Sequence, residues 1–169
     1  MTKTFIKGAL VAAVAFAATP AMAAPTDFTA KAVIIKPLTI SKNSDLTFGT
    51  TTMNPTLTSA TVSVAQASGS AAVCSDTVML TCSGGGEASF TVNGVGTQSV
   101  NLDFGTVPTQ LDNDDGSGAF VAFTADTPGT VALTDGVGTF YVGGTITVDK
   151  TTTTDGSYTA NLTVTASFQ

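Results

Sequence analysis

The sequence predicts an all-β protein built as an antiparallel β-sandwich. Threonine, valine, glycine and alanine dominate the chain, and beyond residue 23 no sustained apolar period of 3.6 occurs together with helix-capping residues. Short alternating segments are separated by dipeptides that tolerate positive φ: Asn93-Gly94, Asp115-Gly116, Asp135-Gly136 and Asp155-Gly156. These dipeptides predict antiparallel neighbours in series, as in an immunoglobulin-like or jelly-roll sandwich, with a closed barrel as the alternative.

The first 23 residues have the three parts of a secretory signal peptide. Lys3 and Lys7 precede an apolar run over residues 8–18, and the small-residue site 21–23 follows it. The run is shorter than the roughly 20 apolar residues that a membrane-spanning helix needs. We therefore expect a cleaved signal peptide over residues 1–23 and a single β-sandwich domain over residues 24–169, exported to the periplasm, the cell surface or the extracellular space.

Ten segments alternate apolar and polar residues in the manner of strands: 28–35, 46–50, 60–64, 78–81, 88–93, 99–104, 119–125, 130–133, 139–148 and 158–168. The side chains expected to fill the core include Phe90, Val92, Phe104, Phe120, Tyr141, Val148 and Leu162. Gly143 and Gly144 predict that the ninth segment is broken there by a bend. Pro37 and Pro55 predict that residues 36–53 form an edge strand or a combination of loop and strand.

Charge and cysteine content narrow the function classes. After removal of residues 1–23, four lysines stand against twelve acidic residues, so the net charge is −8. Such a chain has no basic groove for phosphates, which argues against nucleic acid as a partner, and no later segment is apolar enough to span a membrane. Cys74 and Cys82 are the only cysteines, and in an exported protein this pair predicts a disulfide that pins a local hairpin.

The sequence contains no catalytic constellation, so we expect neither enzyme activity nor a cofactor. The absence of histidine excludes Ser-His-Asp and Cys-His catalysis. Asp103 lies near an acidic stretch, but no apolar pocket is evident that would raise the pKa of a catalytic acid. Within that stretch, Asp112, Asp114 and Asp115 loosely match the ligand spacing of a weak calcium loop, for which a solvated acidic hairpin is the simpler interpretation.

Several short stretches carry a family resemblance. They read AVIIKPLTI at residues 32–40, DLTFG at 45–49, FYVGGTITV at 140–148 and GSYT at 156–159. In this order they resemble an uncharacterised family of small exported bacterial β-proteins, known as domain of unknown function 4402. Residues 50–128 fit the family more loosely, and the resemblance does not explain Cys74 and Cys82.

A more distant resemblance concerns Leu46-Thr47-Phe48-Gly49 and an aromatic residue near the C-terminus, which are similar to features of chaperone-usher fimbrial subunits, including the spore-coat-protein-U-like type. Such pilin-like subunits expose a groove that a periplasmic chaperone, and then a strand of the next subunit, fills by strand addition. The resemblance implies a donor strand with Phe28, Ala30, Ala32 and Ile34 on one face, and a chaperone- or partner-facing strand with Leu162, Val164, Ala166 and Phe168. Residues 33–35 depart from the spore-coat-protein-U-like pattern, which usually has a cysteine there.

Two functions follow as expectations. The first is an exported structural or cell-surface protein that assembles like a fimbrial subunit, with copies of itself or related subunits and a periplasmic chaperone as partners. The second is a self-complete sandwich whose terminal strands pair within one chain, acting as a secreted or periplasmic binding module for a glycan or calcium.

Overall fold

The computed structural model describes residues 26–32 and 37–169. The chain divides into two units, residues 1–34 and residues 35–169, and each is described by itself. In the first unit, residues 26–32 are exposed and form no strand, and the side chain of Phe28 is 91% exposed. The expected signal peptide, and Ile34 of the expected donor strand, lie outside the described residues.

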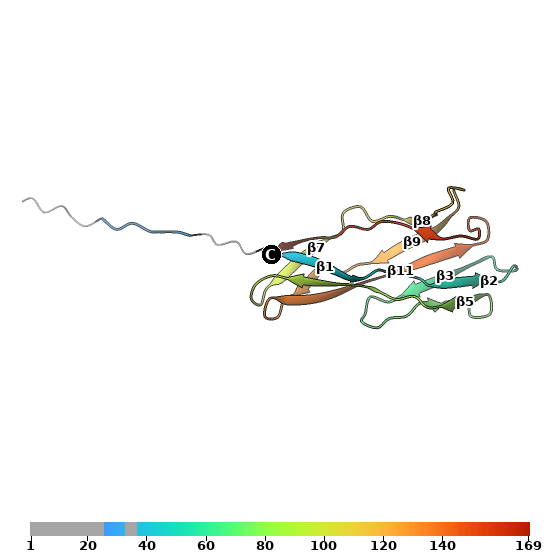
Figure 1. Cartoon of the computed structure of the whole chain (residues 1–169), viewed down its shortest axis with the longest axis horizontal. Coiled ribbons are helices and arrows are strands. Elements are labelled where there is room, and N and C mark those ends of the chain that lie inside the picture. The colour runs from blue at the N-terminus through green and yellow to red at the C-terminus, as the bar shows by residue number, and fades with distance from the viewer. Residues whose placement is uncertain (1–25, 33–36) are drawn as a thin grey trace, which may run out of the picture. The chain divides into compact units, whose positions relative to one another are not determined.

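The second unit is all-β, and its described residues contain no helix (Figure 1). Correspondingly, no helix in the described part of the chain could cross a membrane. The strands are β1 (Thr39–Ser44), β2 (Thr50–Met53), β3 (Ser59–Val64), β4 (Val73–Cys74), β5 (Leu80–Ser83), β6 (Ala88–Asn93), β7 (Ser99–Asp103), β8 (Gln110–Asn113), β9 (Phe120–Asp126), β10 (Thr130–Ala132), β11 (Val137–Asp149), β12 (Tyr158–Thr159) and β13 (Thr165–Phe168).

All strand pairs are antiparallel and form three sheets. The largest sheet has the order β1-β6-β11-β9-β8-β12, and β3 joins it by pairing with β11 and β4. The two smaller sheets are β10-β7-β13 and β2-β5. Strand β11 organises the large sheet, because residues 137–142 pair with β6 while residues 144–149 pair with β3.

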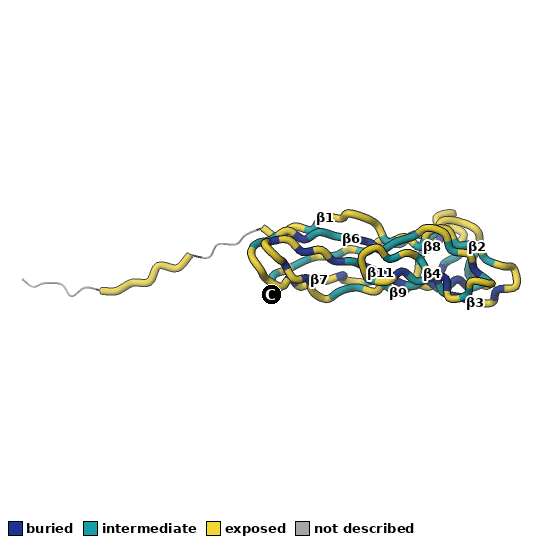
Figure 2. Tube along the Cα trace, turned by 90° about the horizontal axis from the view of Figure 1, so that it is seen from below, coloured by how far each residue is buried: buried dark blue, intermediate teal, exposed yellow. Residues whose placement is uncertain are grey.

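The large sheet packs against both smaller sheets, and this packing makes the predicted sandwich. One core joins Val92 and Phe140 of the large sheet to Val100 and Val131 of the β10-β7-β13 sheet. A second core joins side chains of the large sheet to Leu80, Met53 and Cys82 of the β2-β5 sheet; its large-sheet members include Val62, Val121, Phe123, Ile146 and Val148. Figure 2 shows buried positions alternating with exposed ones along the strands, as the period-two pattern requires.

Three sequence predictions about strands need correction. The ninth segment is not broken at its two glycines, because β11 runs continuously through Gly143 and Gly144. Both glycines are buried, and a Cβ on Gly144 would lie 2.8 Å from Cε2 of Phe123, so close approach explains them better than a bend does. The segment 158–168 is two short strands separated by residues 160–164, and segment 46–50 pairs only at Thr47 and Thr50.

Two of the predicted hairpins also differ. Asn93-Gly94 carries the chain from β6 in the large sheet to β7 in a small sheet, and Asp155-Gly156 leads to β12, which pairs with β8. Asp115-Gly116 does connect a paired hairpin, β8 and β9. At Asp135-Gly136 both residues have positive φ, and Thr134 pairs with Val137 across the turn.

Candidate functional site: a groove with unpaired walls

A groove of about 1120 Å³ opens in the second unit, between residues 46–53 and residues 153–164. Its floor is apolar and comes from the large sheet and the residue after β7: Phe90, Phe104, Val121, Phe123, Val142 and Ile146. These side chains alternate inward along β6, β9 and β11, and most of them also belong to the two cores. The groove therefore gives direct access to the interior of the sandwich.

The first wall consists of residues 46–53, which end in β2. Strand β2 pairs with β5 along one edge, and no other strand among those described pairs with it. Before β2, the backbone of Thr47 exchanges hydrogen bonds of 2.9 and 2.8 Å with Gly86. The ring of Phe48 contacts Phe123 edge-on, with 6.1 Å between centroids. This wall thus carries one free strand edge and is seated on the floor by an aromatic contact.

The second wall includes residues 160–164, which lie between β12 and β13. In the described part of the chain these five residues make no backbone hydrogen bond, although their side chains alternate between exposed and half-buried. The half-buried side chains are those of Ala160, Leu162 and Val164, all of which line the groove. Beyond this wall β13 pairs with β7 on one side only, among the strands described.

The groove combines the two things that an added strand needs. Unpaired N–H and C=O groups on an extended backbone form a template for ladder hydrogen bonds. An apolar floor can bury the alternate side chains of the incoming segment. This groove could therefore accept an extended peptide segment.

The structure places the two sets of predicted interaction residues differently. Among the partner-facing residues, Leu162 and Val164 line the groove, and Ala166 and Phe168 are half-buried against the core that holds Val100. Among the donor residues, Phe28, Ala30 and Ala32 are exposed and belong to the first unit. The donor assignment stays a prediction.

A buried polar residue that the sequence analysis missed supports one end of the second wall. Asn113 is only 6% exposed, and its Nδ2 donates to Thr154 Oγ1 at 3.2 Å. The hydroxyl of Tyr158 donates to the carbonyl of Thr154 at 2.7 Å. Asn113 follows a short polar segment with no apolar alternation, so no pattern in the sequence marks it as buried.

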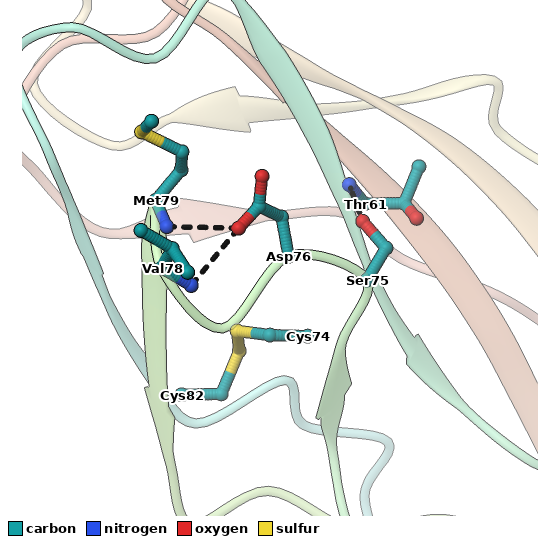
Figure 3. Close-up of a disulfide and its surroundings, with 7 residues drawn as sticks. All are labelled: Thr61, Cys74, Ser75, Asp76, Val78, Met79 and Cys82. Atoms are coloured by element: carbon teal, nitrogen blue, oxygen red, sulfur yellow. Dashed lines mark hydrogen bonds between the residues drawn. A yellow bond between two sulfur atoms is a disulfide. The ribbon is translucent and has the colours of Figure 1, made fainter.

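The disulfide between Cys74 and Cys82 is present, with a Cα–Cα distance of 5.9 Å (Figure 3). The prediction that it pins a local hairpin is wrong, because β4 pairs with β3 of the large sheet whereas β5 pairs with β2. The loop between the cysteines is ordered by Asp76, whose carboxylate accepts hydrogen bonds from the N–H groups of Val78 and Met79. The disulfide is thus a link between two sheets.

In the acidic stretch after Leu111, each of the three carboxylates accepts a hydrogen bond from a different residue. Gln110 donates to Asp112, Thr159 donates to Asp114, and Ser117 donates to Asp115. Hydrogen bonds from the side chain of Ser117 and, to a smaller extent, from its backbone N–H lower the pKa of Asp115. Among the described residues, no group of three or more His, Cys, Asp or Glu side chains is placed to hold a metal ion. Calcium binding here stays a prediction.

Two other carboxylates outside the groove have a lowered pKa. The backbone N–H of Gly69 donates to Glu87 at 2.7 Å and lowers the pKa of that carboxyl. The side chain and the backbone N–H of Thr151 do the same for the pKa of Asp149. Both residues are hydrogen-bond acceptors that hold turns, so they bear on stability and not on the chemistry of the groove.

Comparison with known proteins gives a family and no further relative. The family model described as Domain of unknown function (DUF4402) matches residues 38–168. No curated protein and no solved structure matches the chain. The distant resemblance to chaperone-usher subunits therefore stays a prediction. Because the matched region runs from the residue before β1 to the last residue of β13, and so includes every strand of the sandwich, the chain belongs to the DUF4402 family.

Proposed function

We propose that this protein is an exported structural subunit of the cell surface that assembles by β-strand addition, after cleavage of a signal peptide over residues 1–23. The groove of one copy accepts residues 26–35 of another copy. The observation that carries the proposal is the groove itself, whose apolar floor is flanked by residues 46–53 and residues 160–164. Both walls have backbone groups with no hydrogen-bonding partner among the described residues. An inserted strand would give both walls a hydrogen-bonding partner.

The length of the groove suits a short donor strand. Residues 46–53 span about 26 Å if they are extended at about 3.3 Å per residue. A donor of about eight residues would fill that length, and residues 26–35 provide ten. Their alternation would direct Phe28, Ala30, Ala32 and Ile34 toward the floor.

The chain length favours a second copy over self-insertion. The first wall begins at Leu46, eight residues after Leu38 at the start of the sandwich. A segment of the same chain that turned back before Leu38 would need about eight residues to reach the level of Leu46 again. Only the first four residues of the segment 26–35 would then be left for the groove. A donor from another copy has no such constraint.

The experiment that tests the proposal is an SDS gel without boiling, with a boiled control, of protein sheared from cells that make it. Strand-exchanged subunits are expected to run as a ladder that boiling collapses to one band. Deletion of residues 26–35 should abolish the ladder. Substitution Leu162→Asp, which places a charge in the groove, should abolish it as well, whereas Ser68→Asp, which places the same charge on an exposed turn that does not line the groove, should not.

Mixing the two defective proteins makes the test sharper. Copies that lack residues 26–35 keep the groove, and Leu162→Asp copies keep the donor, so the mixture should form dimers although neither protein assembles alone. A ladder that survives deletion of residues 26–35 would overturn the donor assignment. A single monomer band for the unaltered protein under both conditions would instead support a self-complete sandwich, and ligand screens for glycans and calcium would follow.

A further inference from the structure

We propose that the Cys74–Cys82 disulfide holds the β2 wall of the groove in place, so that strand acceptance depends on this link. The structural part of the inference concerns the seating of β2 on the floor. The functional part rests on the proposed strand addition. Among the described residues, the β2-β5 sheet shares no ladder of strand pairs with either of the other two sheets.

A continuous path of strand pairs and one covalent bond joins the wall to the floor. Thr51 of β2 is paired with Cys82 of β5, and the disulfide leads from Cys82 to Cys74 of β4. Cys74 is paired with Val62 of β3, and Val62 is paired with Ile146 of β11, which lines the floor. The disulfide is the only step of this path that crosses from one sheet to another.

Apart from the connecting loops, the other links between this small sheet and the large one are non-covalent: Leu80 and Met53 pack in the core that holds Val62, and Lys150 Nζ donates to the carbonyl of Pro55 at 2.7 Å. Phe48 touches Phe123 edge-on, and both rings line the groove, so an inserted strand would disturb the contact. The backbone N–H of Asn54 donates to the carbonyl of Met79 at 2.9 Å, but this bond joins the wall to the β5 side of the same small sheet. Without the disulfide, side-chain packing would have to hold β2 and β5 on the floor.

The loop between the two cysteines is anchored to the large sheet on the β4 side. The side chain of Ser75 accepts a hydrogen bond of 2.9 Å from the N–H of Thr61 in β3, and the N–H of Ser75 donates to the carbonyl of Thr61 (Figure 3). Opening the disulfide would therefore leave β4 on the large sheet. The strand released would be β5, together with its partner β2. A wall that is free to move is not preorganised for a ladder, so it should hold a strand less tightly.

The test uses the monomeric full chain, oxidised or treated with dithiothreitol, and the variant Cys74→Ala/Cys82→Ala. Dithiothreitol transfers two electrons to the S–S bond, which leaves two thiols on the protein and the reagent as its cyclic disulfide. The matched control is Val131→Ala, which removes buried methyl groups from the other core and does not line the groove. Two quantities are measured: amide hydrogen exchange of each strand, and the rate at which a labelled peptide of residues 26–35 dissociates.

The expected result is selective. Loss of the disulfide should raise amide exchange in β2 and β5 at least tenfold and leave exchange in β7 and β10 unchanged. It should also speed release of the peptide at least tenfold. Val131→Ala should change neither the exchange in β2 nor the release of the peptide. Unchanged exchange in β2, or an equal rise in all strands, would overturn the inference. Faster exchange with unchanged peptide release would overturn the coupling to strand acceptance. A peptide that fails to bind even the oxidised protein would overturn the proposed function, while exchange still decides the role of the disulfide.

Discussion

Phe28 offers the most direct test of strand addition, because its side chain makes almost no contact with other described residues of the same chain. Its side chain is 91% exposed, so nearly all of its apolar surface is available for burial in a partner. Full burial of a phenylalanine is worth about 1.5–3 kcal/mol, and about 1.4 kcal/mol corresponds to a tenfold change in affinity. Phe28→Ala should therefore weaken binding of the donor segment about 10- to 100-fold.

The assay is fluorescence anisotropy with labelled peptides of residues 26–35 added to the chain that lacks its own donor residues. Thr29→Ala is the matched control, since Thr29 lies on the opposite face of the alternating segment and is also exposed. In the full chain both substitutions should leave the free energy of unfolding within about 0.5 kcal/mol of its original value. Equal binding of the Phe28→Ala and Thr29→Ala peptides would refute the reasoning, as would a large loss of stability in full-length Phe28→Ala.

Three further predictions concern packing, pH and calcium. Gly144→Ala should lower the free energy of unfolding in urea by about 1–3 kcal/mol, because its Cβ would meet Phe123, whereas Gly129→Ala, with open space around it, should change it by less than about 0.5 kcal/mol. The carboxyls of Glu87 and Asp115 have a lowered pKa in the folded state, so the unfolded state takes up protons first as the pH falls. The melting temperature should therefore fall as the pH drops below about 4. A melting temperature that stays constant from about pH 6 to 2 would contradict this. Millimolar calcium should leave the melting temperature unchanged, and a rise that Asp115→Asn removes would instead establish a calcium site.

Local alternation in the sequence was enough to predict many strands but not their partners. Residues 88–93 were predicted as a strand with the bounds that β6 has, because their alternation is regular and a glycine follows directly. The alternation through Leu162 and Val164 also appears in the structure, where both side chains are half-buried and their neighbours are exposed. Nothing in that pattern could reveal that residues 160–164 pair with no strand among the described residues, because alternation reports which face is buried and not which edge is paired.

The predictions failed where a residue type permits two structural roles. Glycines 143 and 144 predict a break in the strand, yet they allow β11 to continue where a Cβ would collide with neighbouring strands. The polar strand β8 was missed, because Gln110, Asp112 and Asn113 give it almost no apolar signal. The groove itself could not be predicted from the sequence, since it arises from the spatial separation of two chain segments that are far apart in sequence.

The unbroken course of β11 has a consequence for how the sandwich unfolds. Phe140 and Val142 belong to one core, and Ile146 and Val148, a few residues later on the same strand, belong to the other. Leu46 and Val107 pack against both cores. Melting either half alone would fray a strand that the other half still holds, so the two cores should lose their structure in one calorimetric transition, whose van't Hoff and calorimetric enthalpies agree. We therefore expect the two cores to unfold as one cooperative unit.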